Sequence, residues 1–161
     1  MTGDYTFREG FAAMDFSRVH GWLAASYWTP AVSRERVERA AANSAMVLGV
    51  FAADGSQVAY ARVISDKTRF AYFCDVIVDE SHRGRGIGRA MVKYVLDHPD
   101  FATVVTWTLA TRDAHGVYAS IGFLPVTDPA SKPQTWMVLR RPREIAEPES
   151  AGDDRAREGT G

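Results

Sequence analysis

Residues 70–98 constrain the fold more than any other stretch of this sequence. Residues 70–78, FAYFCDVIV, form an almost unbroken apolar, aromatic and β-branched run, which is typical of a buried strand. From Ile87 onward the apolar positions recur with the period of a helix, and Pro99 marks its end. The residues between them include glycines at positions 84, 86 and 88. The sequence therefore predicts a strand that enters a helix through a glycine-rich turn.

This turn has the properties of an anion-binding site. The first N–H groups of a helix lack partners within the helix, and glycines leave room for a phosphate to rest on the backbone. Three cations, Arg83, Arg85 and Arg89, bracket the turn. Each cation at a helix N-terminus opposes the helix dipole by roughly 0.3–1 kcal/mol, so we expect an anionic ligand to offset this cost. The alternative is a tight turn with solvated arginines. Neither a Walker loop nor a dinucleotide loop fits, because the first needs Gly-Lys-Ser/Thr and the second needs glycine at position 89.

The pattern Arg83-x-x-Gly86-x-Gly88, preceded by Val-Ile-Val, resembles the signature of the GNAT superfamily of N-acetyltransferases. The resemblance implies acetyl-coenzyme A as co-substrate, its pyrophosphate held by the backbone of the turn and its pantetheine arm paired with the preceding strand. It also implies an α+β fold with a mixed, mostly antiparallel sheet flanked by about four helices. The residues to which it assigns the coenzyme are Val76, Ile77, Val78, Arg83, Gly84, Arg85, Gly86, Ile87, Gly88 and Arg89, with Thr111, Asp113 and Tyr118 further along the chain.

Residues 113–123, DAHGVYASIGF, resemble the second signature of the same family, in which Ala, Tyr and Gly-Phe follow at these spacings. The resemblance gives Tyr118 the role of general acid. An amine that attacks a thioester forms a tetrahedral intermediate that expels a thiolate, and a nearby phenol can protonate that thiolate as it leaves. The alternative is that Tyr118 only packs its ring and hydrogen-bonds the coenzyme. Many relatives carry asparagine where Thr111 stands, and Thr111, Arg112 or Asp113 could take over its contact with the pantetheine arm.

The base that accepts the amine's proton is harder to find. Asp75 is the only carboxylate in the predicted central strand, and burial disfavours the charged form of a carboxyl, which would make it a better proton acceptor. A buried structural acceptor of hydrogen bonds is an equal alternative for Asp75. Glu35 and His115 are weaker candidates, because Glu35 is expected on the surface and His115 on the coenzyme helix.

The sequence contains fewer signals for the acceptor site than for the coenzyme site. In the GNAT superfamily the connection between the first two helices commonly lines the acceptor site, and here it contains Tyr27 and Trp28. We expect these two to contact the substrate. Aromatic residues that could line a pocket for an apolar or cationic group are Tyr27, Trp28, Tyr72, Phe73 and Trp136, although core packing is the alternative for most of them. The expected acceptor is a primary amine of a small molecule or a protein.

Composition excludes several other classes of protein. The formal net charge of −1 argues against a nucleic-acid binder, and no run of 18 apolar residues could span a membrane. The four histidines lack ligand spacing and the single cysteine, Cys74, lies in the apolar strand, so we expect no metal and no disulfide. The N-terminus has neither a basic start nor an apolar segment, which argues against a signal peptide. We expect a cytoplasmic protein, with a homodimer as one arrangement.

The rest of the chain predicts a single domain over residues 1–141 and a polar, disordered tail over 142–161. Asp15 and Ser33 are predicted N-caps of two helices, and Asp113 that of a short helix over residues 114–121. Predicted strands are residues 6–8, 45–52, 57–65, 70–78 and 104–110, followed by a closing pair at 123–126 and 135–139. Other functions consistent with these patterns are a non-catalytic acyl-CoA-binding module, an acyltransferase for longer acyl groups, and an enzyme that modifies antibiotics or, less in keeping with the charge, tRNA.

Overall fold

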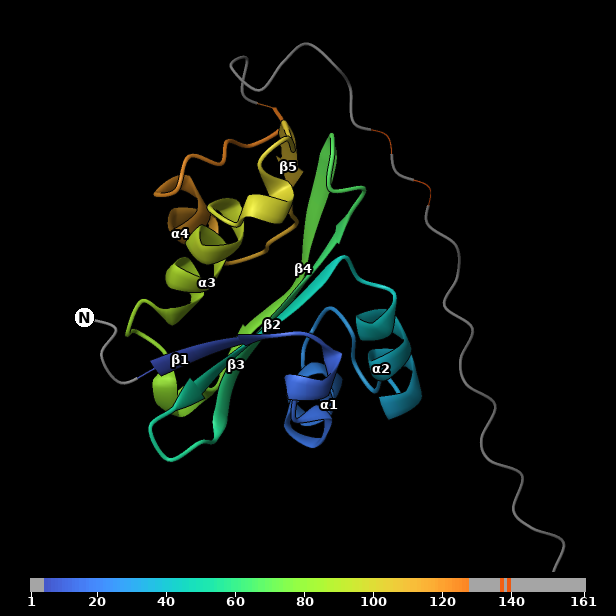
Figure 1. Ribbon diagram of the computed structural model, residues 1–161, viewed down its shortest axis with the longest axis vertical. Coiled ribbons are helices and arrows are strands. Elements are labelled where there is room, and N and C mark those ends of the chain that lie inside the picture. Colours follow the sequence, from blue (N-terminus) through green and yellow to red (C-terminus); the bar gives the residue numbers. More distant parts are fainter. Residues whose placement is uncertain (1–4, 128–136, 138, 140–161) are drawn as a thin grey trace, which may run out of the picture. The chain divides into compact units, whose positions relative to one another are not determined.

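A computed structural model describes residues 5–127, 137 and 139 of the chain. The chain divides into two units, Met1–Leu124 and Pro125–Gly161. The helices and strands described all lie in the first unit (Figure 1). The predicted tail over 142–161 lies outside the described residues, so the boundary at residue 141 stays a prediction.

The described elements begin with one strand and two α-helices, continue with three consecutive strands, and end with a third α-helix, a fifth strand and a fourth α-helix. The strands are β1 (Tyr5–Glu9), β2 (Met46–Ala52), β3 (Gln57–Ser65), β4 (Phe70–Val78) and β5 (Thr106–Thr108). The α-helices are α1 (Phe16–Ala24), α2 (Arg34–Ala42), α3 (Ile87–Leu96) and α4 (His115–Ala119). Short 3-10 helices are η1 (Phe11–Ala13), η2 (Glu80–His82) and η3 (Pro99–Phe101).

The strands form one mixed sheet in the order β1-β2-β3-β4-β5. The first four are antiparallel to their neighbours, whereas β5 runs parallel to β4. Among the described residues this gives five strands and four α-helices, which confirms the predicted α+β class and its mostly antiparallel sheet.

Two apolar layers cover the two faces of the sheet. On one face α3 contributes Ile87, Met91, Val92 and Val95, all of them buried. On the other face α1 and α2 pack against Val47, Phe51 and Tyr60. Figure 1 shows α1 and α2 on one side of the sheet and α3 and α4 on the other. Each side chain buried in full contributes about 1.5–3 kcal/mol, so burial of these residues holds α1, α2 and α3 against the sheet.

The helices α1 and α2 begin at the capping residues that the sequence predicts. The Asp15 carboxylate accepts the N–H groups of Ser17 and Arg18 at the start of α1, and the Ser33 hydroxyl accepts that of Arg36 at the start of α2. Gly55 takes a positive φ of 83° in the turn between β2 and β3. These caps confirm the predicted helix starts, and the turn lies between the strands predicted over residues 45–52 and 57–65.

The C-terminal elements differ from the prediction. The strand expected over residues 104–110 is limited to Thr106–Thr108, and residues 123–126 form no strand. Of the expected partner at 135–139, residues 135, 136 and 138 lie outside the described residues. The sequence overestimated the length of strand over residues 104–110, because a β-branched, apolar run predicts a strand without showing where its pairing ends.

Candidate functional site

A β-bulge interrupts the pairing of β3 with β4. Val63 pairs with Phe73 and Arg62 with Cys74, but Tyr60 pairs with Ile77, so β4 carries one more residue than β3 between these points. The bulge falls at Asp75, whose φ of 52° lies in the left-handed region. Aspartate is among the few non-glycine residues that adopt this conformation readily. Sequence patterns alone did not reveal the bulge.

The bulge also changes which side chains face which helices. Before it, Ala71 and Phe73 pack toward α3; after it, Val76 and Val78 do so. Ile77 packs instead against the layer of α1 and α2. The extra residue therefore shifts the alternation of β4 by one position.

On its other side β4 separates from β5. The two strands pair only from Phe70 with Thr106 to Tyr72 with Thr108. Beyond Tyr72, β4 has no strand partner on that side within the described part of the chain. Val76, Ile77 and Val78 lie along this unpaired edge and are half-buried. An unpaired strand edge presents backbone N–H and C=O groups to a ligand, as the predicted pantetheine contact requires.

The glycine loop, defined as residues 83–89, follows β4 and η2. Gly84 and Gly86 have φ values of 74° and 79°, and a Cβ at either position would meet no atom within 4 Å. Gly86 is the N-cap of α3 and offers no side chain to the helix N-terminus. The first four N–H groups of a helix have no partner within it, and no described side chain accepts them. Bare amides therefore line an open surface at the start of α3.

The arginines of the glycine loop are held in different ways. The Nε of Arg83 donates to the Val78 carbonyl oxygen at 3.1 Å. The guanidinium of Arg85 donates to the Tyr5 hydroxyl at 3.1 Å and to the Ser81 carbonyl oxygen at 3.2 Å. Arg89 is exposed and makes no recorded polar contact within the described residues. Thus two arginines brace the loop and a third is available to a ligand.

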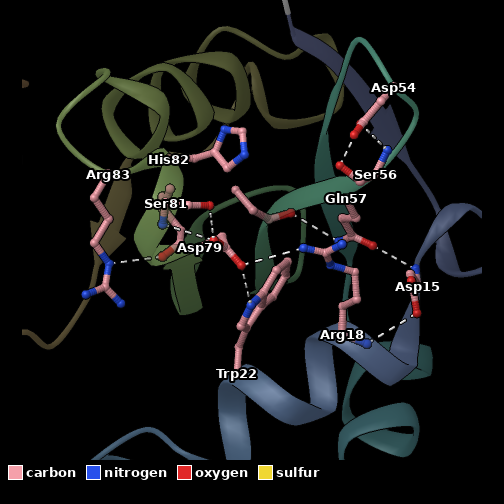
Figure 2. A network of polar contacts seen from close by, with 12 residues as sticks. Asp15, Arg18, Trp22, Asp54, Ser56, Gln57, Asp79, Ser81, His82 and Arg83 are labelled. Atoms are coloured by element: carbon pink, nitrogen blue, oxygen red, sulfur yellow. Dashed lines mark hydrogen bonds and ion pairs between the residues drawn. The ribbon is translucent and has the colours of Figure 1, made fainter.

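Asp79 connects η2, the short helix that precedes the glycine loop, to α1 (Figure 2), and the sequence patterns did not predict this link. One oxygen accepts the Ser81 N–H at 3.0 Å and hydroxyl at 2.6 Å, which starts η2. The other oxygen accepts the Trp22 indole N–H at 3.2 Å and lies 3.6 Å from Arg18. The hydrogen bonds from Ser81, with those from Trp22 and the charge of Arg18, lower the pKa of Asp79. A carboxylate between a strand and a Ser, as in Asp79-Glu-Ser, is a capping signal that the sequence does contain.

The short helix α4 begins differently from the prediction. Its N-cap is Ala114, and Asp113 does not cap it. The Thr111 hydroxyl oxygen instead accepts the Ala114 N–H at 3.0 Å. At its other end Gly122 takes a φ of 103°, and the Phe123 N–H bonds the Tyr118 carbonyl oxygen at 3.1 Å, which confirms the predicted glycine end.

Tyr118 lies on α4 and is half-buried. Its ring meets that of Phe123 edge to face, with centroids 6.0 Å apart. Burial raises the pKa of Tyr118, and the nearby Tyr27 and Asp113 raise it further. The phenol therefore keeps its proton at neutral pH, as a general acid must.

The aromatic wall, defined as Tyr27, Trp28, Asp75 and Arg112, joins three separate segments. The Trp28 indole N–H donates to the Asp75 carboxylate at 3.1 Å, and the Tyr27 and Trp28 rings meet edge to face at 4.9 Å. The Arg112 guanidinium lies 3.7 Å from the Tyr27 ring centroid, and its backbone N–H donates to the Tyr27 hydroxyl at 3.2 Å. Tyr27, Trp28 and Asp75 are thus brought together, and Tyr27 also lies near Tyr118.

Arg62 also belongs to this cluster, and the sequence patterns did not predict its contact with Asp75. Its Nε lies 2.5 Å from the second oxygen of Asp75, and its Nη1 donates to the Ser44 hydroxyl at 3.4 Å. An arginine inside the otherwise apolar strand of residues 57–65 was the available signal, because a charge is buried only with a partner.

Other predicted residues lie elsewhere. Phe73 is 3% exposed and stacks on Trp107 in the core, so of its two alternatives core packing holds and the pocket role does not. Tyr72 is half-buried at the end of the β4–β5 pairing, and Trp136 lies outside the described residues. Glu35 and His115 are exposed on α2 and α4.

The described part of the chain contains no group of three or more His, Cys, Asp or Glu side chains arranged to hold a metal ion. None of its helices is both long enough and apolar enough to cross a membrane.

Comparisons with known proteins give this geometry a context. The sequence model of the family described as "Acetyltransferase (GNAT) domain" matches residues 46–125, from β2 through α4. A protein of Schizosaccharomyces pombe in the UPF0039 group is 32% identical over 79 residues, which are 47% of this chain and 53% of that protein. The chain therefore spans about half the length of the curated relative it matches.

Solved structures extend the similarity over most of the chain. An acetyltransferase of Deinococcus radiodurans R1 has a TM-score of 0.66 at 18% identity over 88% of this chain and 91% of that one, which shows the fold alone. An acetyltransferase assigned to the GNAT family, from Xanthomonas campestris pv. campestris, is 38% identical with a TM-score of 0.72. That alignment covers 83% of this chain and 93% of the other. With this relative and the matching family model, the chain belongs to the GNAT family.

Proposed function

We propose that this protein is an N-acetyltransferase that moves the acetyl group of acetyl-CoA to a primary amine. The observation that carries the proposal is the continuity of two surfaces. The unpaired edge of β4 at Val76, Ile77 and Val78 is followed, after η2, by the bare amides of the glycine loop, and the Val78 side chain lies 3.8 Å from a Cβ built at Gly88. One extended, anionic ligand with an amide-bearing arm fits both surfaces, as coenzyme A does.

The glycine loop would hold the pyrophosphate of the coenzyme. Gly84 and Gly86 leave the space in which phosphate oxygens can approach the backbone, and the N-terminus of α3 favours negative charge. Arg89 is exposed where it can pair with a phosphate. The pantetheine arm would take up the hydrogen bonds that β5 does not make with β4, and Thr111 would still have its hydroxyl hydrogen to donate to the arm.

The chemistry follows from where the thioester would then lie. The amine would lose one proton and its nitrogen would attack the carbonyl carbon. The carbon–sulfur bond would then break as the nitrogen loses a second proton, and the thiolate would take the proton of the Tyr118 hydroxyl. One of the two protons lost by the nitrogen would restore the phenol, and the other would pass to solvent. A backbone N–H near the end of β4, with Val78 as first candidate, would stabilise the charge that develops on the carbonyl oxygen. The raised pKa of Tyr118 keeps its proton available until the thiolate leaves.

The acceptor amine would enter at the aromatic wall. An alkyl amine has a pKa of about 10.4 and arrives as a cation at neutral pH. The rings of Tyr27 and Trp28 offer faces and edges that attract cations. The wall includes Asp75 at the bulge, and its Tyr27 lies near Tyr118, so an amine bound there would lie beside the proposed general acid.

Two measurements test the proposal. Calorimetry should detect binding of acetyl-CoA and of CoA, and release of free thiol from acetyl-CoA should depend on adding one of a panel of primary amines. Binding without thiol release from any amine would indicate a non-catalytic module. Faster release from longer acyl-CoA substrates would indicate a different acyl group. No heat with any form of the coenzyme would refute the proposal.

A further inference from the structure

We propose that Asp75 is a positioning residue that holds the β4 bulge and Trp28 in place, and that the acceptor amine loses its proton to water and not to Asp75. This inference rests on the proposed function and concerns the same site. It chooses between the two roles that the sequence leaves open for this carboxylate.

The backbone of Asp75 is the first observation. Among the described non-glycine residues only Ala31, Lys67 and Asp75 have a positive φ. Ala31 and Lys67 lie in connections between elements, whereas Asp75 lies inside a strand, at the residue that interrupts the β3–β4 pairing. The left-handed conformation is strained for most side chains, so contacts around it must hold it.

The contacts of its carboxylate are the second observation. One oxygen pairs with Arg62 at 2.5 Å and the other accepts the Trp28 N–H at 3.1 Å. The side chain of Asp75 is 10% exposed and that of Arg62 is 17% exposed. Both oxygens are therefore engaged by protein donors in a setting largely closed to solvent.

This arrangement opposes a role as proton acceptor. A proton on Asp75 would leave the Arg62 guanidinium buried beside a neutral group, and breaking one side of a buried ion pair is costly. The same event would weaken the bond to Trp28 in the aromatic wall. Each turnover would then disturb the surface that orients the amine.

The other ionisable groups around Asp75 give no better base. Burial raises the pKa of Cys74 to about 11. Burial likewise raises the pKa of Tyr60, a fully buried residue. Tyr118, on α4, also has a raised pKa. All three are protonated at neutral pH, and the cation paired with Asp75 is Arg62. None of these described neighbours of Asp75 is therefore free to accept the amine's proton, which we assign to solvent.

The positioning role has a structural purpose. Arg62 ties Asp75 to β3 and, through its bond to Ser44, to the start of β2. Trp28 ties the α1–α2 connection to the same carboxylate. One side chain thus fixes both the bulge that opens β4 and the wall against which the amine would bind.

Four variants separate the two roles: Asp75→Asn, Arg62→Gln, the double variant with both changes, and Arg62→Gln with Asp75→Ala. Asparagine tolerates a positive φ and can accept from Trp28, but it cannot act as a base. Alanine lacks both properties. The readouts are kcat/KM for the best amine between pH 6 and pH 10, the affinity for acetyl-CoA by calorimetry, and the melting temperature.

The positioning role predicts a specific pattern. Asp75→Asn alone should lose about 10–100-fold in kcat/KM, because it leaves Arg62 buried without a charged partner. Adding Arg62→Gln should restore kcat/KM to within about tenfold of the wild type, and the rate should rise with pH as in the wild type. The variant with Arg62→Gln and Asp75→Ala should keep a low kcat/KM and should bind acetyl-CoA more weakly than the wild type.

The opposite pattern would overturn the proposal. If Asp75 is the base, the double variant with asparagine must remain at least about 100-fold below the wild type and lose the wild-type pH dependence. Failure of the proposed function looks different, because the wild type itself would then show no thiol release. In that event acetyl-CoA affinity decides: equal affinity of the asparagine and alanine double variants, at equal melting temperature, would refute the positioning role.

Discussion

The two sides of the candidate site are built in opposite ways. The glycine loop is contiguous in sequence and offers a ligand mainly backbone groups, bare because Gly84 and Gly86 have no side chains. The aromatic wall offers side chains from the α1–α2 connection, β4 and the loop before α4. The glycine loop can bind a ligand only where side chains are absent. The aromatic wall can do so only when its side chains are held in one arrangement.

This difference predicts how each side tolerates change. A backbone surface should be indifferent to most neighbouring side chains and intolerant of a Cβ at its glycines. A surface made of side chains should lose function gradually as single contacts are removed. Single substitutions on each side, with matched controls, test this difference.

The largest effect should come from Gly86→Val. A β-branched residue is strained at a φ of 79° and would cover the amides of α3, so acetyl-CoA affinity should fall by about 100-fold or more. Calorimetry checks this. Gly55→Val is the matched control, because Gly55 has a φ of 83° in a turn with open space around it. Both variants should melt at lower temperature, but Gly55→Val should bind acetyl-CoA normally; an equal loss of affinity would assign the effect to folding.

Tyr118→Phe should have the next largest effect. Loss of the phenol proton should lower kcat by about 100-fold or more with little change in acetyl-CoA affinity, since general acids contribute in this range. The control is Tyr94→Phe, which removes an exposed phenol whose pKa is also raised, by its hydrogen bond to Glu9. Steady-state thiol release should be normal in that control. An unchanged kcat in Tyr118→Phe would leave Tyr118 without a catalytic role.

A pair of tryptophan variants compares the two sides directly. Trp28 and Trp22 each donate an indole N–H to a carboxylate, at 3.1 Å to Asp75 and at 3.2 Å to Asp79. Trp28→Phe should raise KM for the amine by about 3–10-fold and leave acetyl-CoA affinity unchanged, given 0.5–1.5 kcal/mol per hydrogen bond. Trp22→Phe should instead weaken acetyl-CoA affinity by about 3–10-fold and leave KM for the amine unchanged. Identical kinetic changes in the two variants would contradict the separation of the two sides.

The smallest effect should appear at acid pH. The hydrogen bonds from Ser81 lower the pKa of Asp79, so its stabilising contribution is present above the ordinary value of about 3.9 and is lost as pH falls through the lower folded value. Melting temperatures of the wild type should therefore fall below about pH 4, and those of Asp79→Asn should fall less steeply. Asp54, whose pKa Ser56 lowers in the same way, provides the control. Asp54→Asn should not alter acetyl-CoA affinity at any pH, whereas Asp79→Asn should weaken it at neutral pH.

The contrast also explains what the sequence could predict. The strand, the glycine loop and the start of α3 depend on neighbours in the chain, so the pattern in residues 70–98 was sufficient to predict them. The caps at Asp15 and Ser33 were predictable for the same reason. The pairs Arg62–Asp75 and Arg112–Tyr27 join residues that are distant in sequence, so no local signal identifies the partner.

The bulge lies between these two cases. Its signal was present as a shift in alternation, from Ala71 and Phe73 to Val76 and Val78, but every residue around Asp75 is apolar and hides the shift. The prediction of Asp113 as the cap of α4 was wrong for another reason. Asp113 and Thr111 are both capping types, and only the path of the backbone decides which is used.

The extra residue in β4 carries a last consequence. Deleting position 75 alone would leave the apolar side chains of β4 on their present faces and allow the β3–β4 ladder to run without interruption. The shorter chain would have a more regular sheet and the same core, but it would lack the bulge and the carboxylate that Arg62 and Trp28 contact. A natural sequence that drops this one residue should therefore be a folded protein without the turnover proposed for this chain.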